Sequence, residues 1–253
     1  MTPHLARASR YAALIALLLG VIGWCEPAWS QSLSLDLGQG GQAGTTSRLI
    51  QITVAMAVLS LAPSLFVMLT AFTRIVIVLS LLRSGIGAQG TPPNTVIIGL
   101  ALFLTFFVMQ PTLEQAWTNG LLPMARGETT ELVGLRVTAE PFRKFMLLNA
   151  RAADLTSFLD IGKIEPPARV EDMPWRALVP AFMVGELRRA FEMGFLLFLP
   201  FLIIDMVVAS VLMSMGMMML PPTSVSLPFK LVFFVLVDGW RLIAGSLVQS
   251  FHS

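Results

Sequence analysis

The chain has 253 residues, of which 55% are hydrophobic and 13% are charged, and its formal net charge is +2. A soluble globular protein carries about 25% charged residues, so the composition excludes an ordinary soluble domain. The small, scattered charge also excludes a typical nucleic-acid-binding protein, which needs a basic face or stripe. Several stretches of the length that crosses a bilayer, about 20 residues, are nearly free of charge, so we expect a membrane protein.

Residues 1–30 are predicted to be a cleaved signal peptide. Arg7 and Arg10 give a positive start, a short apolar core follows, and the small residues Ala28 and Ser30 occupy the positions that signal peptidase reads. A first membrane anchor is the alternative interpretation, but the core is short and no stop-transfer charge follows it. We therefore expect cleavage near Ser30.

The mature chain begins with a predicted flexible exported tail at residues 31–48, which is rich in Gly, Ser, Gln and Thr. Residues 49–110 are expected to form a first helical hairpin of two hydrophobic stretches. The first stretch is too long for one straight span, so we expect a kink or break at Pro63. The second stretch runs over residues 95–109 and stops at a Gln-Pro pair.

A polar region follows at residues 111–189, with ten basic and ten acidic residues. Within it, residues 140–158 have the apolar spacing of one amphipathic helix. Residues 190–253 are expected to form a second helical hairpin, whose hydrophobic stretches span about residues 190–213 and 227–248. The expected fold class is therefore all-α, with four long, kinked hydrophobic segments arranged as membrane-associated hairpins.

The signal peptide sets the predicted orientation, because residue 31 then starts on the periplasmic side. The turn after the first stretch and the tip of the second hairpin follow on the cytoplasmic side, and the polar region and both mature termini on the periplasmic side. Arg83 and Lys230 give this orientation weak support from the positive-inside rule, and the long polar loop does not count against it.

Six charged residues lie in or at the margins of the hydrophobic stretches: Arg74, Glu192, Asp205, Lys230, Asp238 and Arg241. A charge at mid-bilayer costs about 2.5–3.5 kcal/mol on insertion scales, so each needs a protein or water partner. Lys230 and Arg241 lie three helical turns apart, with Asp238 on nearly the same face. This stripe predicts an ion pair with Asp205, either between helices or between copies of the chain. Glu192 and Lys230 fit equally well as residues that reach the membrane interface from helix ends.

Groups for catalysis or metal binding are sparse. The only cysteine, Cys25, and one of the two histidines, His4, lie within the predicted signal peptide, and the other histidine is His252. We therefore predict neither an enzyme nor a metal- or cofactor-binding protein. A secondary transporter for small solutes is the strongest alternative, but such proteins usually have two related halves, and here the halves differ.

Five methionines occur within residues 213–219, at the predicted tip of the second hairpin. Methionine side chains are flexible and adapt to whatever packs against them. A ring of such tips could close a pore and part for a moving polypeptide, although ordinary hydrophobic packing explains the run equally well. Gly216 and the Pro221-Pro222 pair favour a loop over a continuing helix.

Two segments carry a resemblance to a known family. The sequence PAFMVGELRRAFEMGF at residues 180–195, and PPTSVSLPFK at 221–230 with VDGW at 237–240, resemble the hallmark segments of the FliP/SctR family of type III secretion export-gate proteins, and its flagellar branch in particular. The triplet at 217–219 is similar to the methionine gasket of that family. Members usually carry a small hydroxyl residue where this chain has Gly185, which puts a local hydrogen bond in doubt.

The resemblance implies a core subunit of the flagellar protein export gate, in the basal body at the bacterial inner membrane. Five copies would assemble with four of FliQ and one of FliR into a ring or cone, among other export-apparatus membrane proteins, and unfolded substrates would pass through its centre. By motif, the closed constriction is implied at Met217, Met218 and Met219. The hallmark segment that shapes subunit packing is implied to include Phe182, Glu186, Phe191 and Gly194.

Overall fold

The structure is a computed structural model and describes residues 52–53, 56–57, 60–61, 63–88, 90–217 and 219–251. The predicted signal peptide and exported tail lie outside the described residues, and so does Met218. The chain divides into two units, and the unit described below is Ala57–Ser253. Its described elements are all helices, which confirms the predicted all-α fold class.

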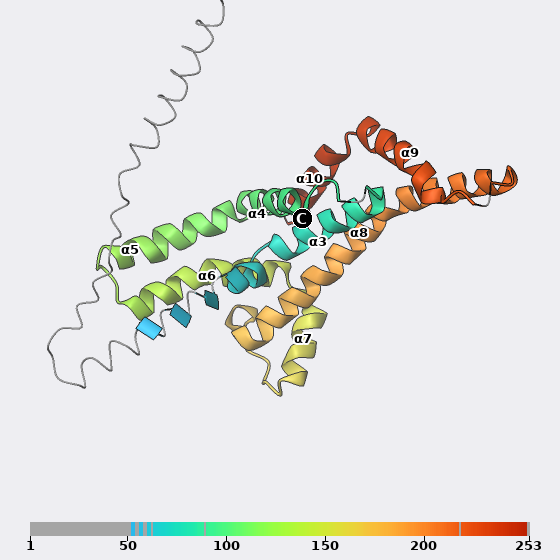
Figure 1. The fold of residues 1–253 in the computed structure, drawn as a ribbon. Coiled ribbons are helices and arrows are strands. Elements are labelled where there is room, and N and C mark those ends of the chain that lie inside the picture. The colour runs from blue at the N-terminus through green and yellow to red at the C-terminus, as the bar shows by residue number, and fades with distance from the viewer. Residues whose placement is uncertain are drawn as a thin grey trace, which may run out of the picture. The chain divides into compact units, whose positions relative to one another are not determined.

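Figure 1 shows the labelled helices in chain order. They are α3 (Phe72–Ile86), α4 (Asn94–Ala116), η1 (Trp117–Leu121), α5 (Leu122–Ala125), α6 (Glu131–Asn149), α7 (Ala152–Ile161), η2 (Val170–Asp172), α8 (Trp175–Ser214), α9 (Pro222–Leu236) and α10 (Gly239–Gln249).

Four of the helical stretches match the four predicted hydrophobic segments. Among the described residues, Asn94–Ala125 and Trp175–Ser214 are long and apolar enough to span a membrane. Two bent pairs, Pro63–Leu69 with α3 and α9 with α10, raise the number to four if each pair is one span. The predicted kinks are therefore present, at 83° in the first pair and 63° in the second.

The first bend lies between Leu69 and Phe72, whereas the sequence indicated Pro63. Threonine hydroxyls account for its position. Thr70 Oγ1 donates a hydrogen bond to the carbonyl of Phe66 at 2.6 Å, and Thr73 Oγ1 donates one to the carbonyl of Val67 at 2.8 Å. These hydroxyls satisfy backbone carbonyls that a break in an apolar helix leaves without their usual partners.

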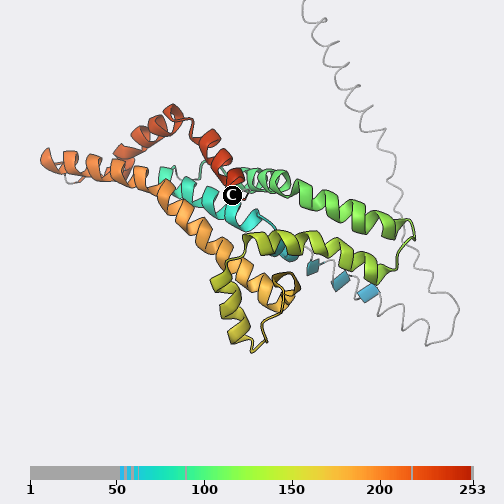
Figure 2. The ribbon, with the colours of Figure 1, turned by 180° about the vertical axis from the view of Figure 1, so that it is seen from behind.

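The long helix α8 lies beside α3 over much of its length (Figures 1 and 2). Small residues allow the two helices to approach closely. A Cβ atom added to Gly194 would lie 2.2 Å from Leu81 Cδ1, and one added to Gly85 would lie 3.0 Å from the rings of Phe198 and Phe201. Because α8 is continuous, the predicted boundary at residue 190 between the polar region and the second hairpin lies inside one helix.

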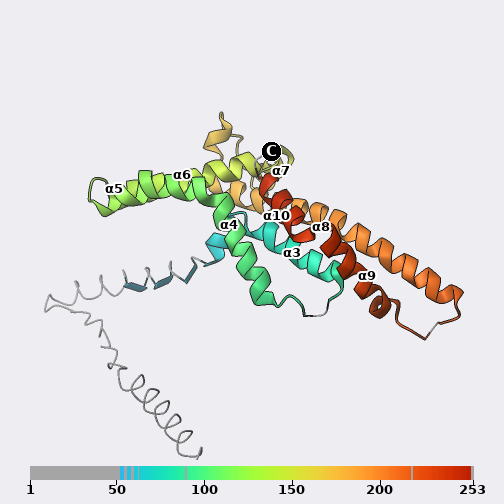
Figure 3. The ribbon, with the colours of Figure 1, turned by 90° about the horizontal axis from the view of Figure 1, so that it is seen from above.

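A second hairpin is formed by α4, η1 and α5 on one side and α6 on the other (Figure 3). The helix continues beyond Pro111, where the hydrophobic stretch ends, so the apolar segment and the polar region share one rod. The π-helical turn η1 brings Gly120 so close to α6 that an added Cβ atom would lie 2.7 Å from the Thr138 Cα atom.

The predicted single amphipathic helix over residues 140–158 is wrong, because α6 ends at Asn149 and α7 begins at Ala152. Ala150 and Arg151 have extended backbone between them. The Asn149 side chain donates a hydrogen bond to the Phe145 carbonyl at 3.0 Å and so satisfies one of the last carbonyls of α6. The apolar spacing continues across this turn, and it therefore gave no sign of the break.

Candidate functional site

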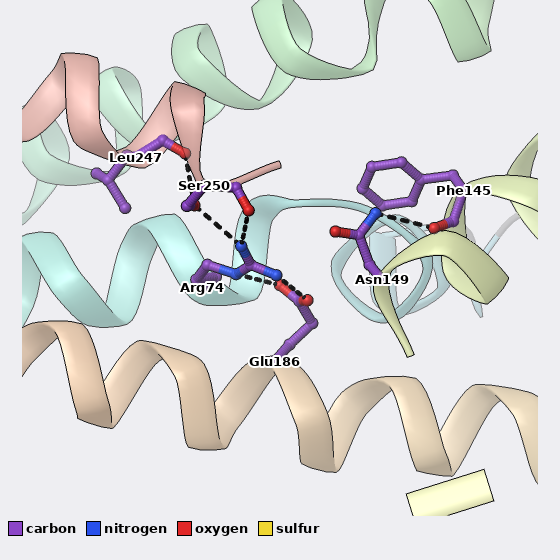
Figure 4. Close-up of polar contacts among 6 residues, drawn as sticks. All are labelled: Arg74, Phe145, Asn149, Glu186, Leu247 and Ser250. Atoms are coloured by element: carbon purple, nitrogen blue, oxygen red, sulfur yellow. Dashed lines mark hydrogen bonds and ion pairs between the residues drawn. The ribbon is translucent and has the colours of Figure 1, made fainter. Parts of the chain in front are cut away.

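A buried ion pair joins α3 to α8. Arg74 and Glu186 are both 0% exposed, and Arg74 Nε donates a hydrogen bond to Glu186 Oε2 at 2.8 Å, while Nη2 donates to Oε1 (Figure 4). This two-point contact is the geometry in which a guanidinium and a carboxylate bind most strongly. The sequence identified Arg74 as needing a partner, and Glu186 as part of the hallmark segment, but it did not indicate that they pair.

The end of the chain completes the surroundings of Arg74. Its Nη1 donates to both the carbonyl oxygen and the hydroxyl oxygen of Ser250, each at 2.9 Å (Figure 4). The guanidinium carbon lies 3.7 Å from the ring centroid of Phe251, which stacks on Phe145 at 6.0 Å. Sequence reasoning missed Ser250 and Phe251, because a serine and a phenylalanine beside a terminus carry no signal of such a role.

A second polar cluster lies where α9 meets α8 and the end of α3. Lys230 Nζ contacts Asp205 Oδ2 at 2.6 Å and donates to the Gly85 carbonyl at 3.1 Å. Ser226 Oγ donates to Asp205 Oδ1 at 2.5 Å. The Lys230 side chain is 6% exposed and that of Asp205 is 28% exposed. The structure therefore brings together the two charges that the sequence predicted to pair, within one chain.

The other intramembrane charges lie at the surface. The 63° bend separates Lys230 on α9 from Arg241 on α10, so the predicted stripe along one continuous helix is wrong. Asp238 and Arg241 face each other at 3.6 Å with side chains 63% and 85% exposed. Glu192 pairs with Arg188 one turn away at 2.8 Å, also at the surface. Neither surface pair reaches Asp205 in the described part of the chain.

The methionine run lies at the turn between α8 and α9, which is the tip at the far right of Figure 1. Gly216 has a φ of 74°, a left-handed conformation that glycine adopts easily, and Pro222 opens α9, where its missing N–H is not needed. Exposed fractions are 41% for Met217 and 98% for Met219, and Met218 lies outside the described residues. The tip thus presents thioether side chains to its surroundings.

The hallmark segment has two faces. Phe182 and Glu186 are 0% exposed and face the interior, where the Phe182 ring meets that of Phe145 at 5.9 Å. Gly194 is also buried against α3. Phe191 points outward and is 56% exposed. Three of its four residues therefore hold α8 within this chain, and the fourth belongs to its outer surface.

Gly185 lies beside an unsatisfied acceptor. Asp154 Oδ2 is buried and accepts no hydrogen bond from the described residues, and a Cβ atom added to Gly185 would lie 3.4 Å from it. A hydroxyl side chain at this position could therefore donate to Asp154. This is the local hydrogen bond that the departure from the family pattern put in doubt.

Together these groups form a structural site whose charged partners are already paired. Among the described residues, no group of three His, Cys, Asp or Glu side chains is placed to hold a metal ion. The arrangement can clamp helices and present an adaptable apolar tip. Large apolar side chains on α4 also remain exposed, at Phe103, Phe106, Phe107 and Trp117.

Comparison with known proteins gives consistent matches. The model of the FliP family matches residues 55–247. Three similar proteins are each named flagellar biosynthetic protein FliP. The one from Caulobacter vibrioides is 52% identical over 96% of this chain and 92% of its own. The one from Agrobacterium fabrum is 46% identical over 96% and 99%, and the one from Bacillus subtilis 49% identical over 81% and 93%.

Proposed function

The chain belongs to the FliP family, and from this premise we propose that copies of it form the channel through which unfolded flagellar proteins cross the bacterial inner membrane. Membership makes it a membrane component of the flagellar export apparatus. The proposal adds the channel, its gate and its neighbours.

The observation that carries the proposal is the contrast between the two sides of α8. Its inner side contains the buried pairs of Glu186 and Asp205, whereas only 11% of the residues in its most apolar window are buried. Exposed apolar residues continue to the tip of the hairpin, with Phe195, Ile203 and Met206 each about 60% exposed. A helix that has satisfied its charges internally and leaves this much apolar surface uncovered needs lipid or protein against it.

We assign much of that cover to neighbouring subunits. In this proposal five copies surround a common axis, with four copies of FliQ and one of FliR completing a helical cone, and other export-apparatus proteins lie around it. A cyclic arrangement repeats the same contact between successive copies, so it brings identical hairpin tips together around one centre. Phe191 on α8 and Phe103 on α4 are candidate contact residues, because both are exposed in the single chain.

The gate in this proposal is the methionine tip. Met217, Met218 and Met219 from each copy close the constriction, because flexible thioether chains can fill an irregular gap and then give way to a passing polypeptide. The clamp of Lys230 on Asp205 and on the Gly85 carbonyl lies near the base of the hairpin and supports the tip. The tip faces the cytoplasm, and both mature termini lie in the periplasm.

Native mass spectrometry of the purified chain, co-expressed with FliQ and FliR, tests the assembly. We expect a complex that contains about five copies of this chain. A matched preparation without FliQ and FliR shows whether the chain forms rings by itself. If the chain stays monomeric in the presence of both neighbours, the channel proposal is wrong.

A further inference from the structure

We propose that the last described turn of the chain, residues 247–251, is an anchor that positions the α8–α9 hairpin and its methionine tip. The inference rests on the proposed function for the meaning of the tip. The anchor itself rests on contacts within one chain. It assigns a positioning role to Ser250 and Phe251, at the very end of the sequence.

The first step is that one side chain joins both ends of the segment 186–250. Arg74 binds Glu186 through Nε and Nη2, near the start of α8, and binds Ser250 through Nη1, just after α10 (Figure 4). Between these two contacts the chain runs along α8 to the tip and returns through α9 and α10. The segment is thus a loop closed on a single guanidinium group.

The second step is that the anchor is buried and specific. Leu247 is 0% exposed, and Ser250 Oγ donates to the Leu247 carbonyl at 2.8 Å, so the turn is ordered on both of its sides. Without Ser250, Nη1 of the buried Arg74 would lose both of its acceptors, which is unfavourable for a charged donor away from water. The face of Phe251 adds a cation–π contact with Arg74.

The third step is that nothing strong at the bend between α9 and α10 holds it in place. Asp238 has a φ of 52°, a left-handed conformation that is costly for a residue with a side chain. Its ion pair with Arg241 is exposed and stabilises little. An apolar cavity of about 250 Å³ lies under the bend, lined by residues that include Phe201, Phe234 and Ile243.

A strained backbone next to a cavity persists when the segments on both sides of it are fixed. Lys230 fixes α9 on one side, through Asp205 and the Gly85 carbonyl, and the anchor fixes α10 on the other. Figure 2 shows α9 and α10 arching from the far end of α8 back to the C-terminus beside α3. Release of the anchor would leave Lys230 as the remaining polar fixation of this arch, and the hairpin tip would be free to shift.

Two pairs of variants test the anchor in the assembled complex. The first pair is a chain that ends after Gln249 and a control that ends after His252. The second pair, Phe251→Leu and Phe251→Tyr, keeps the chain length and removes or keeps the aromatic face; it serves if the shortened chain does not assemble. Amide hydrogen exchange over residues 239–249 measures docking of α10, and ion leakage through the closed gate in cells measures the position of the tip.

We expect exchange to rise about tenfold in the chain ending after Gln249 and several-fold in Phe251→Leu, each with increased leakage, and to stay unchanged in both controls. Unchanged exchange in the first variant of each pair would overturn the anchor. Faster exchange without leakage would overturn its positioning role if Met217→Ala together with Met219→Ala does leak. If that double tip variant does not leak either, the proposed gate fails, and so does the role of the anchor in positioning it.

Discussion

Arg74 and Glu186 are separated by 112 residues in the sequence, yet they form a two-point ion pair in which neither side chain is exposed. One residue comes from α3 and the other from α8, so the pair fastens the first hydrophobic segment to the third. A buried pair of this kind does not stabilise a protein much more than apolar residues would, but the loss of one partner leaves an uncompensated charge. This asymmetry gives the first prediction.

Replacement of either partner alone should strongly destabilise the protein. We expect Arg74→Met or Glu186→Met to lower the free energy of unfolding by about 3–5 kcal/mol, and the double variant to lose less than either single variant. Thermal unfolding in detergent measures these differences. Arg188→Met and Glu192→Met are the matched controls from the exposed pair on α8, and they should have little effect. Equal losses at the buried and exposed pairs would contradict the account.

The cluster of Asp205 and Lys230 should matter for assembly of the hairpins. Lys230→Met removes contacts with both α8 and the Gly85 carbonyl, whereas Asp205→Asn keeps an oxygen that can still accept from Ser226. We therefore expect Lys230→Met to reduce the yield of assembled complex in detergent more than Asp205→Asn does. Arg241→Met, at an exposed position, is the control and should assemble normally. Normal assembly of Lys230→Met would show that the clamp is dispensable.

Gly185→Ser should stabilise the contact between α7 and α8. Its hydroxyl can donate to Asp154 Oδ2, which is buried without a partner among the described residues, and such a hydrogen bond contributes about 0.5–1.5 kcal/mol. Gly185→Ala is the matched control, since alanine has the higher helix propensity but no donor. A serine variant that unfolds at a higher temperature than the alanine variant confirms the bond, and the opposite order excludes it.

Close packing of η1 against α6 should make Gly120 intolerant of a side chain. Gly120→Ala places a methyl group 2.7 Å from backbone atoms of Thr138, and we expect a loss of about 1–3 kcal/mol. Gly99→Ala in the same rod has nothing within 4 Å of the added atom, so its higher helix propensity should leave stability unchanged or raised. Thermal unfolding of the two variants compares them directly; similar midpoints would show that the hairpin relaxes around the methyl group.

The sequence was informative where one physical rule acts over a short range. Apolar stretches of membrane length predicted the four hydrophobic segments, and the need of intramembrane charges for partners predicted that Asp205 and Lys230 would meet. The bend after α9 had a signal that we did not use, because the Asp238-Gly239 dipeptide is a common turn sequence. The roles of these residues in subunit packing stay predictions.

Other features depend on contacts between distant parts of the chain. The pairing of Arg74 with Glu186, and the closure of that site by Ser250, join segments whose local sequences contain no reference to one another. The bend before α3 depends on hydroxyl contacts of Thr70 and Thr73, residues that are also compatible with an unbroken helix. A single sequence could identify the residues that need partners but not which partners they find.

The most direct test of the channel is replacement of the tip. Met217, Met218 and Met219 are changed together to Ala in cells that carry the rest of the export apparatus, and ion leakage is measured with secretion of flagellar proteins. Met206→Ala, on the exposed side of α8 away from the tip, is the control. We predict that the triple variant leaks ions while the control does not. A triple variant that assembles, holds back ions and secretes normally would contradict a gate made of these methionines.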